Sequence, residues 1–165
     1  MSTRDAQRGK VYAAEQFVRT LFDRAAEHGS RAVDFFGTPL TLPPEGRFAS
    51  MDSVRAYVGS VLNHPGVQQH WPRAGPIAVR PRRGVTAAHY ERIDGDAVIA
   101  VPARHDGWAL RELVVLHEIA HHFCDATPAH GPEFVGTFCE LAGLVMGAEV
   151  EHVLRVVYSK EGVRG

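Results

Sequence analysis

Two histidines and a glutamate occur at the spacing used by metal-dependent hydrolases. Residues 116–121 read Leu-His-Glu-Ile-Ala-His, so His117 and His121 are four positions apart and Glu118 directly follows the first. On a helix, residues four apart share one face with Cβ atoms about 5–6 Å apart, so both imidazoles can reach one cation. Glu118 would project beside the cation, where a carboxylate can serve as the base for metal-bound water. The pattern predicts a metal-binding helix with Glu118 as its catalytic base.

The residues around the motif favour metal binding over a purely structural role for the histidines. Apolar residues recur with helical periodicity from 108 to 124, on almost every side of the predicted helix. Two imidazoles without partners would be costly in such a buried helix. The chain contains ten histidines, and histidine is the commonest metal-ligand side chain.

A catalytic zinc takes three protein ligands and keeps a fourth position open, so a third ligand is expected downstream. We favour His130, which follows His121 after eight intervening residues and precedes the next predicted helix. Glu140 is the main alternative, because its separation from His121 resembles that of zinc aminopeptidases completed by a glutamate from the following helix. Asp125, or a site without a third protein ligand, remains open as well.

The whole pattern, His-Glu-x-x-His followed after eight residues by His-Gly-x-x-Phe, resembles the signature of the SprT-like minimal zinc metallopeptidases. The likeness is strongest over residues 113–134 and extends upstream through 88–91 and 98–102. The opening residues 4–8 and 11–15 are also similar to a family of uncharacterised bacterial metallohydrolases built around the same signature.

The resemblance implies Zn²⁺ held by His117, His121 and His130, with Glu118 as catalytic base and peptide hydrolysis as the reaction. Some SprT-like members act on proteins crosslinked to DNA. This chain departs from them because it has no cysteine-rich zinc-binding extension and no strongly basic tail. A peptide or protein substrate is therefore expected, and a nucleic-acid partner is not.

The order of predicted elements indicates an α+β fold. An Asp-Gly signal at 94–95 predicts a hairpin, and hence a small antiparallel sheet of three to four strands. N-terminal helices are expected before this sheet. A zincin-like active-site helix and further C-terminal helices are expected after it. Residues 63–66 are expected to break the chain, and His70-Trp71-Pro72 to lie in a loop. Helices are expected at 9–28, 51–62, 108–124, 132–146 and 149–159, and strands within 32–42 and at 77–80, 85–92 and 97–101.

Composition points to one compact domain over residues 1–165, with 1–8 as a short flexible tail. The 165 residues are 45% hydrophobic and carry a formal net charge of −1, which argues against non-specific nucleic-acid binding. No apolar run is long enough to span a bilayer, so a soluble protein without a membrane partner is expected. Two cysteines and no apolar leader favour the cytoplasm.

Several other polar residues are assigned lesser roles. His122 points about 100° away from His121 around the helix, so we expect it to support a ligand or face solvent. The two cysteines are expected to be small buried residues. Weak candidates for stabilising an oxyanion are Tyr90, His89 and Tyr158. Residues expected to be mainly surface groups are His89, His105, Arg80, Arg82 and Arg83.

The sequence thus predicts a zinc-dependent hydrolase, in the first place a metallopeptidase that cleaves peptide bonds with water activated by Glu118. An extended peptide could add as a strand to the edge of the sheet. The alternative from another class is a catalytically silent zinc-binding module for protein interaction or regulation. A third reading makes the histidines purely structural and predicts no stoichiometric metal.

Overall fold

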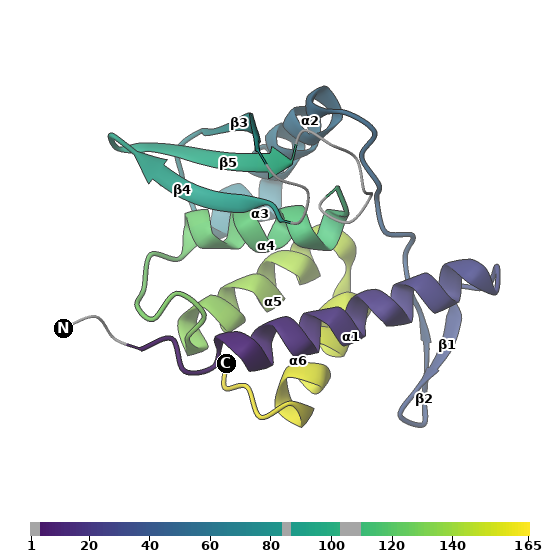
Figure 1. Ribbon diagram of the computed structural model, residues 1–165. Helices are drawn as coiled ribbons and strands as arrows, with labels where there is room; N and C mark the ends of the chain where they lie inside the picture. Colours follow the sequence, from purple (N-terminus) through teal and green to yellow (C-terminus); the bar gives the residue numbers. More distant parts are fainter. Residues whose placement is uncertain (1–3, 84–86, 103–109) are drawn as a thin grey trace. The chain divides into compact units, whose positions relative to one another are not determined.

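The computed structural model describes residues 4–83, 87–102 and 110–165, and it confirms the predicted α+β fold (Figure 1). The chain divides into two compact units. One contains the residues up to Pro44 together with Cys124–Gly165, and the other contains Glu45–Phe123. Within the described ranges, no helix combines the length and the apolar character needed to cross a bilayer.

The unit Glu45–Phe123 is built on a sheet of three strands in the order β3-β5-β4. The predicted hairpin is confirmed: β4 and β5 pair antiparallel, and their turn has positive φ at Asp94 (51°) and Gly95 (87°), as a tight Asp-Gly turn requires. The elements are α2 (Met51–Leu62), α3 (Pro65–His70), β3 (Ile77–Arg82), β4 (His89–Ile93), β5 (Asp96–Pro102) and α4 (Glu112–Phe123).

The expectation of a wholly antiparallel sheet is wrong for β3, which pairs parallel with β5. Strand β5 is buried along nearly its whole length, which suits a central strand covered on both faces. Chain order alone suggests the sequence β3-β4-β5. The uninterrupted apolar run of β5 was the available sign that it lies between the other two.

The expected break after α2 is confined to residues 63 and 64, and a short helix that was not expected follows it. Pro65 occupies the first turn of α3, and the backbone N–H of Gly66 donates to Nδ1 of His64 at 3.1 Å. Proline fits this position because its missing N–H would be unpaired in any helix. Helix α2 ends as predicted, and its start is fixed by a capping box between Ser50 and Ser53.

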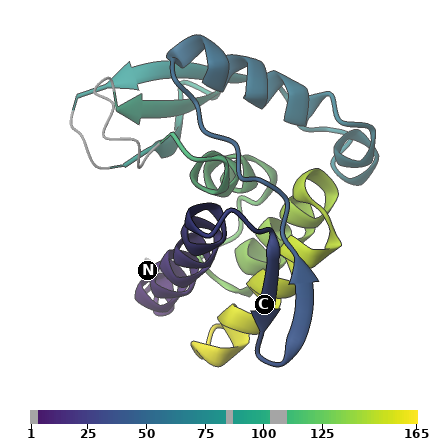
Figure 2. The same cartoon turned by 90° about the vertical axis from the view of Figure 1, so that its right-hand side faces the viewer.

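The other unit packs three helices with one β-hairpin. Helix α6 contacts both α1 and α5, and buried apolar side chains from all three form the core. The expected strand within 32–42 is in fact two strands that form a hairpin (Figure 2). The ring of Phe35, at the end of the first strand, lies 6.1 Å from the ring of His152 on α6. The elements are α1 (Arg8–Glu27), β1 (Ala32–Phe35), β2 (Thr38–Thr41), α5 (Pro132–Met146) and α6 (Ala148–Lys160).

Candidate metal centre

Helix α4 presents His117 and His121 on one face, as the spacing predicted. Their Nε2 atoms lie 3.2 Å apart, and their rings are 5.0 Å apart between centroids. Two nitrogens that each bind a tetrahedral zinc at about 2.0–2.1 Å are separated by about 3.3 Å. The observed separation therefore fits two ligands of one zinc ion. His117 is buried and His121 is half-buried, so the pair is shielded from bulk water.

The start of α4 is fixed by acidic side chains from the segment before α2 and from the helix itself. The buried carboxylate of Glu45 pairs with Arg111 and also accepts a hydrogen bond from the Leu113 N–H at 3.1 Å. Glu112 accepts from the Gly46 N–H at 2.9 Å and from the Tyr57 hydroxyl at 2.6 Å. The bond to Leu113 satisfies one of the amides that the start of a helix leaves without a partner. The bonds to Gly46 and Tyr57 tie the first turn of α4 to the preceding segment and to α2.

Burial and the neighbouring Glu112 carboxylate raise the pKa of Tyr57 well above its ordinary value. The phenol is therefore neutral at physiological pH and acts as a hydrogen-bond donor to Glu112. None of these contacts was expected from the sequence, because Glu45 and Arg111 are 66 positions apart.

His130 is held by residues from the start of the chain. Its Nδ1 atom lies 2.7 Å from Oδ2 of Asp5, and its carbonyl oxygen accepts a hydrogen bond from Nε2 of Gln7 at 2.9 Å. The ring lies 5.2 Å from each of the rings of Tyr12 and Phe134. An Nδ1–H that donates to Asp5 leaves Nε2 as the metal-binding atom, which is how carboxylates commonly orient zinc-bound histidines.

Gly131 allows the close turn that follows His130. A Cβ atom at this position would lie 3.1 Å from the Pro128 carbonyl oxygen and 3.2 Å from the Pro128 ring. The Gly131 N–H donates to that same carbonyl at 3.0 Å. The glycine of the His-Gly-x-x-Phe pattern thus serves backbone packing, while its phenylalanine, Phe134, packs on the His130 ring.

The side chains of His117, His121 and His130 lie close enough to hold a metal ion. Each offers one ring nitrogen, and these nitrogens all lie within 4.8 Å of one another. Among the residues that the structure describes, neither Glu140 nor Asp125 belongs to this group. Of the three candidates for a third ligand, His130 is the one whose ring nitrogen lies near those of His117 and His121.

The carboxylate of Glu118 is fixed by the outer strand of the sheet. Its Oε2 atom accepts a hydrogen bond from the backbone N–H of Tyr90 on β4 at 2.7 Å, and the residue is only 8% exposed. The contact joins α4 to β4 directly beside the histidines. Among the described residues, Glu118 is not a member of the three-histidine group.

His122 is bound to protein groups on both of its ring nitrogens. Nε2 lies 2.8 Å from the carbonyl oxygen of Gly75, and Nδ1 lies 3.1 Å from the Tyr90 hydroxyl. The carbonyl can only accept, so Nε2 carries the proton and Nδ1 accepts from Tyr90. Burial lowers the pKa of His122, which favours this neutral form. The expectation that His122 could face solvent is wrong, because the residue is buried. Its partner Tyr90 also stacks on His121, with 6.4 Å between the ring centroids.

The remaining candidates have other surroundings. His89 is exposed on β4, and Tyr158 is buried in the core of its own unit, which does not suit a group that must meet substrate. Both cysteines are free thiols. Cys139 is buried as expected, and burial raises its pKa to about 12. Cys124 was also expected to be buried, but it is half-buried. His105 lies outside the described residues.

The arginine cluster behaves mainly as a surface feature. Arg80 pairs with Glu91 on β4, and Arg82 donates to the carbonyl oxygen of Ala87 at 3.2 Å. Arg83 is exposed. A phosphate-binding role has no support from these contacts.

Sequence reasoning missed the residues that position His130. Asp5 and Gln7 were assigned to a tail, yet both bond to His130 across more than a hundred residues of chain. Their polar side chains in a segment without periodicity gave no sign of a long-range contact. The one available sign was the similarity of residues 4–8 and 11–15 to the bacterial metallohydrolase family. These two segments contain Asp5, Gln7 and Tyr12.

Comparisons of the chain with protein-family models, with curated proteins and with solved structures find no match. The resemblance of residues 113–134 to SprT-like metallopeptidases therefore stays a prediction. The chemistry of the site has to be inferred from its own side chains.

Proposed function

We propose that this protein is a zinc-dependent hydrolase, most simply a metallopeptidase, whose ion is held by His117, His121 and His130. The observation that carries the proposal is the convergence of three ring nitrogens within 4.8 Å of one another. Three neutral imidazoles suit zinc, and a three-ligand set leaves one coordination position for water or substrate. A purely structural site would be expected to close that position with a fourth protein ligand.

When bound, zinc supplies Lewis acidity, which acidifies a coordinated water and polarises a carbonyl. The chain itself supplies the proton acceptor. Glu118 would take the proton of the attacking water on its carboxylate and return it to the departing amine. The hydrogen bond from the Tyr90 N–H fixes the direction of that carboxylate before substrate arrives.

The protein also orients its own ligands. Asp5 accepts a hydrogen bond from the Nδ1–H group of His130. This bond leaves Nε2 without a proton and directed away from Asp5. Tyr12 and Phe134 pack against the same ring and limit its rotation. These contacts reduce the reorganisation needed when the metal binds.

The outer edge of β4 is a suitable place for an extended peptide. Strand β4 is terminal in the order β3-β5-β4, and its Tyr90 N–H points away from β5 toward Glu118. A peptide that added to this edge as a further strand would run past the catalytic carboxylate. This arrangement favours a peptide substrate over a small amide.

The test is metal analysis combined with hydrolysis of a peptide library by the wild type and by Glu118→Gln. We expect about one zinc per chain in both proteins, and cleavage by the wild type alone. Glu133→Gln, an exposed glutamate in the first turn of α5, is the matched control and should keep both properties. Equal cleavage by Glu118→Gln would overturn the mechanism, and bound zinc without any cleavage would favour the silent zinc-binding module.

A further inference from the structure

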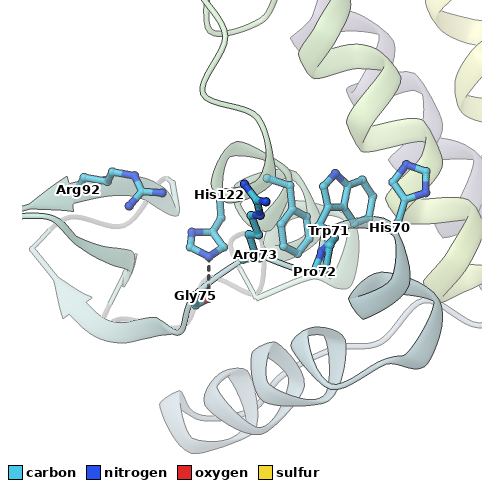
Figure 3. Close-up of a pocket in the computed structure, with 9 residues that line it drawn as sticks. His70, Trp71, Pro72, Arg73, Gly75, Arg92 and His122 are labelled. Atoms are coloured by element: carbon cyan, nitrogen blue, oxygen red, sulfur yellow. Dashed lines mark hydrogen bonds between the residues drawn. The ribbon is translucent and has the colours of Figure 1, made fainter.

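A second feature of the unit Glu45–Phe123 is a pocket of about 340 Å³ beside the end of α4 (Figure 3). This volume lies within the range of pockets that bind small molecules or single side chains. None of the zinc-ligand candidates lines it. Its principal walls are formed by His70, Trp71, Arg73, Arg92, His122 and Phe123.

One wall of the pocket is flat and aromatic. The rings of Trp71 and Phe123 are stacked with centroids 4.5 Å apart and an angle of 3° between their planes. His70 packs on the far side of Trp71 at 4.4 Å. Since Phe123 and His70 cover the two faces of Trp71, a planar apolar group would pack on the outer face of Phe123 or against the edges of the stacked rings.

The charged side chains that line the pocket are two arginines, Arg73 and Arg92. Figure 3 shows the guanidinium of Arg92 directed from β4 toward His122. Nη1 of Arg92 lies 3.5 Å from the carbonyl oxygen of Gly95. In the described part of the chain neither arginine forms an ion pair, and no acidic side chain lines the pocket.

The pocket is linked to the candidate catalytic helix. His122 and Phe123 directly follow the ligand candidate His121 on α4. The Tyr90 hydroxyl bonds to His122, and the Tyr90 N–H bonds to Glu118. A group seated in the pocket therefore contacts residues within one helical turn of the proposed ligand His121.

From the two arginine side chains and the aromatic stack that line it, we propose that this pocket binds a carboxylate of a peptide that carries an aromatic residue next to it. Arginine recognises carboxylates with two parallel hydrogen bonds, and the stacked rings would receive the aromatic side chain. As a substrate subsite, the pocket rests on the proposed metallopeptidase function. The carboxylate could belong to the chain terminus or to an acidic side chain.

The test is calorimetric titration of the full-length protein, as purified and after removal of metal by a chelator. The probes are N-acetyl-phenylalanine, its amide, and N-acetyl-glutamyl-phenylalanine amide. We expect one of the acids to bind in both preparations, and the neutral amide to bind at least about tenfold more weakly. The tighter acid identifies the terminal or the side-chain carboxylate as the ligand.

Arg73→Gln and Arg92→Gln should each weaken binding of that acid by about tenfold, because each removes a charged hydrogen-bond donor. Arg83→Gln removes the same charge from an exposed position outside the pocket and should bind as the wild type does. Equal binding of acid and amide, or an equal loss in Arg83→Gln, would overturn the proposal.

Acid binding and peptide hydrolysis, measured on the same protein, distinguish this proposal from the proposed function. Arginine-dependent binding of an acid without any hydrolysis would uphold the pocket and contradict the metallopeptidase. Peptide cleavage that depends on Glu118 but is indifferent to the carboxylate would contradict the pocket as a substrate subsite and uphold the metallopeptidase.

Discussion

Oδ2 of Asp5 lies 2.7 Å from Nδ1 of His130, although the two residues are 125 positions apart. The imidazole of His130 is 8% exposed and the Asp5 side chain 23%, so the pair is largely shielded from water. A carboxylate on the second nitrogen of a metal-binding histidine fixes its tautomer and makes the free nitrogen a better ligand. In the proposed metal site, Asp5 would therefore orient His130 and raise the basicity of its Nε2 atom.

Replacing Asp5 by Asn should weaken zinc binding by about 10–100-fold without unfolding the protein. The amide can still form a hydrogen bond, but it lacks the negative charge that raises the basicity of the ring. The affinity can be measured by competition with a chromophoric chelator. Glu27→Gln, which removes a charge from an exposed position at the end of α1, should leave the affinity unchanged. Equal affinities of Asp5→Asn and the wild type would contradict an orienting role for Asp5.

The third ligand can be identified by comparing His130→Ala with Glu140→Ala. We expect the first variant to lose bound zinc and the second to retain about one ion per chain, because only His130 belongs to the group of converging nitrogens. Elemental analysis after dialysis against metal-free buffer provides the measurement. Metal retained by His130→Ala and lost from Glu140→Ala would assign the position to the glutamate instead.

The buried pair of Glu45 and Arg111 should be essential for the stability of α4. Both side chains are almost inaccessible, at 4% and 5% exposure, and Glu45 also bonds to the Leu113 N–H. Glu45→Ala should lower the free energy of unfolding by about 3–5 kcal/mol, because it leaves a buried charge without its counterpart.

The surface pair of Glu91 and Arg80 provides the control for Glu45→Ala. Arg80 is 46% exposed, so Glu91→Ala should cost at most about 1 kcal/mol. Urea unfolding monitored by circular dichroism compares the two variants. A loss in Glu45→Ala no larger than that in Glu91→Ala would show that the buried pair contributes little.

The sequence predicted the elements that depend on local pattern. The bounds of α2 and α5 agree with the apolar periodicity, and the turn at Asp94 and Gly95 follows from a two-residue signal. The spacing of His117 and His121 places both on one face of α4, because that geometry is a property of any helix.

The features that the sequence did not predict depend on long-range contacts. The parallel pairing of β3 with β5 cannot be derived from alternation, which is the same for either neighbour. Asp5 and Glu45 have ordinary polar surroundings in the sequence, and only the fold brings them to His130 and Arg111. The pocket by Trp71 was likewise not predicted, because only the fold brings residues 70–75 to Arg92 on β4 and to the end of α4.

Tyr57 should make the protein less stable above about pH 10, the ordinary pKa of a tyrosine. Burial first, and then the Glu112 carboxylate, raise the pKa of Tyr57 in the folded state. Above pH 10 the unfolded chain therefore releases a proton that the folded chain keeps, so stability falls with pH by at most about 1.4 kcal/mol per unit from this residue. Tyr57→Phe should be less stable than the wild type at pH 7, where the hydrogen bond to Glu112 is lost, but its stability should decline less steeply between pH 10 and 11.5. Urea unfolding at a series of pH values measures both effects, and parallel declines in the two proteins would show that Tyr57 is not the group responsible.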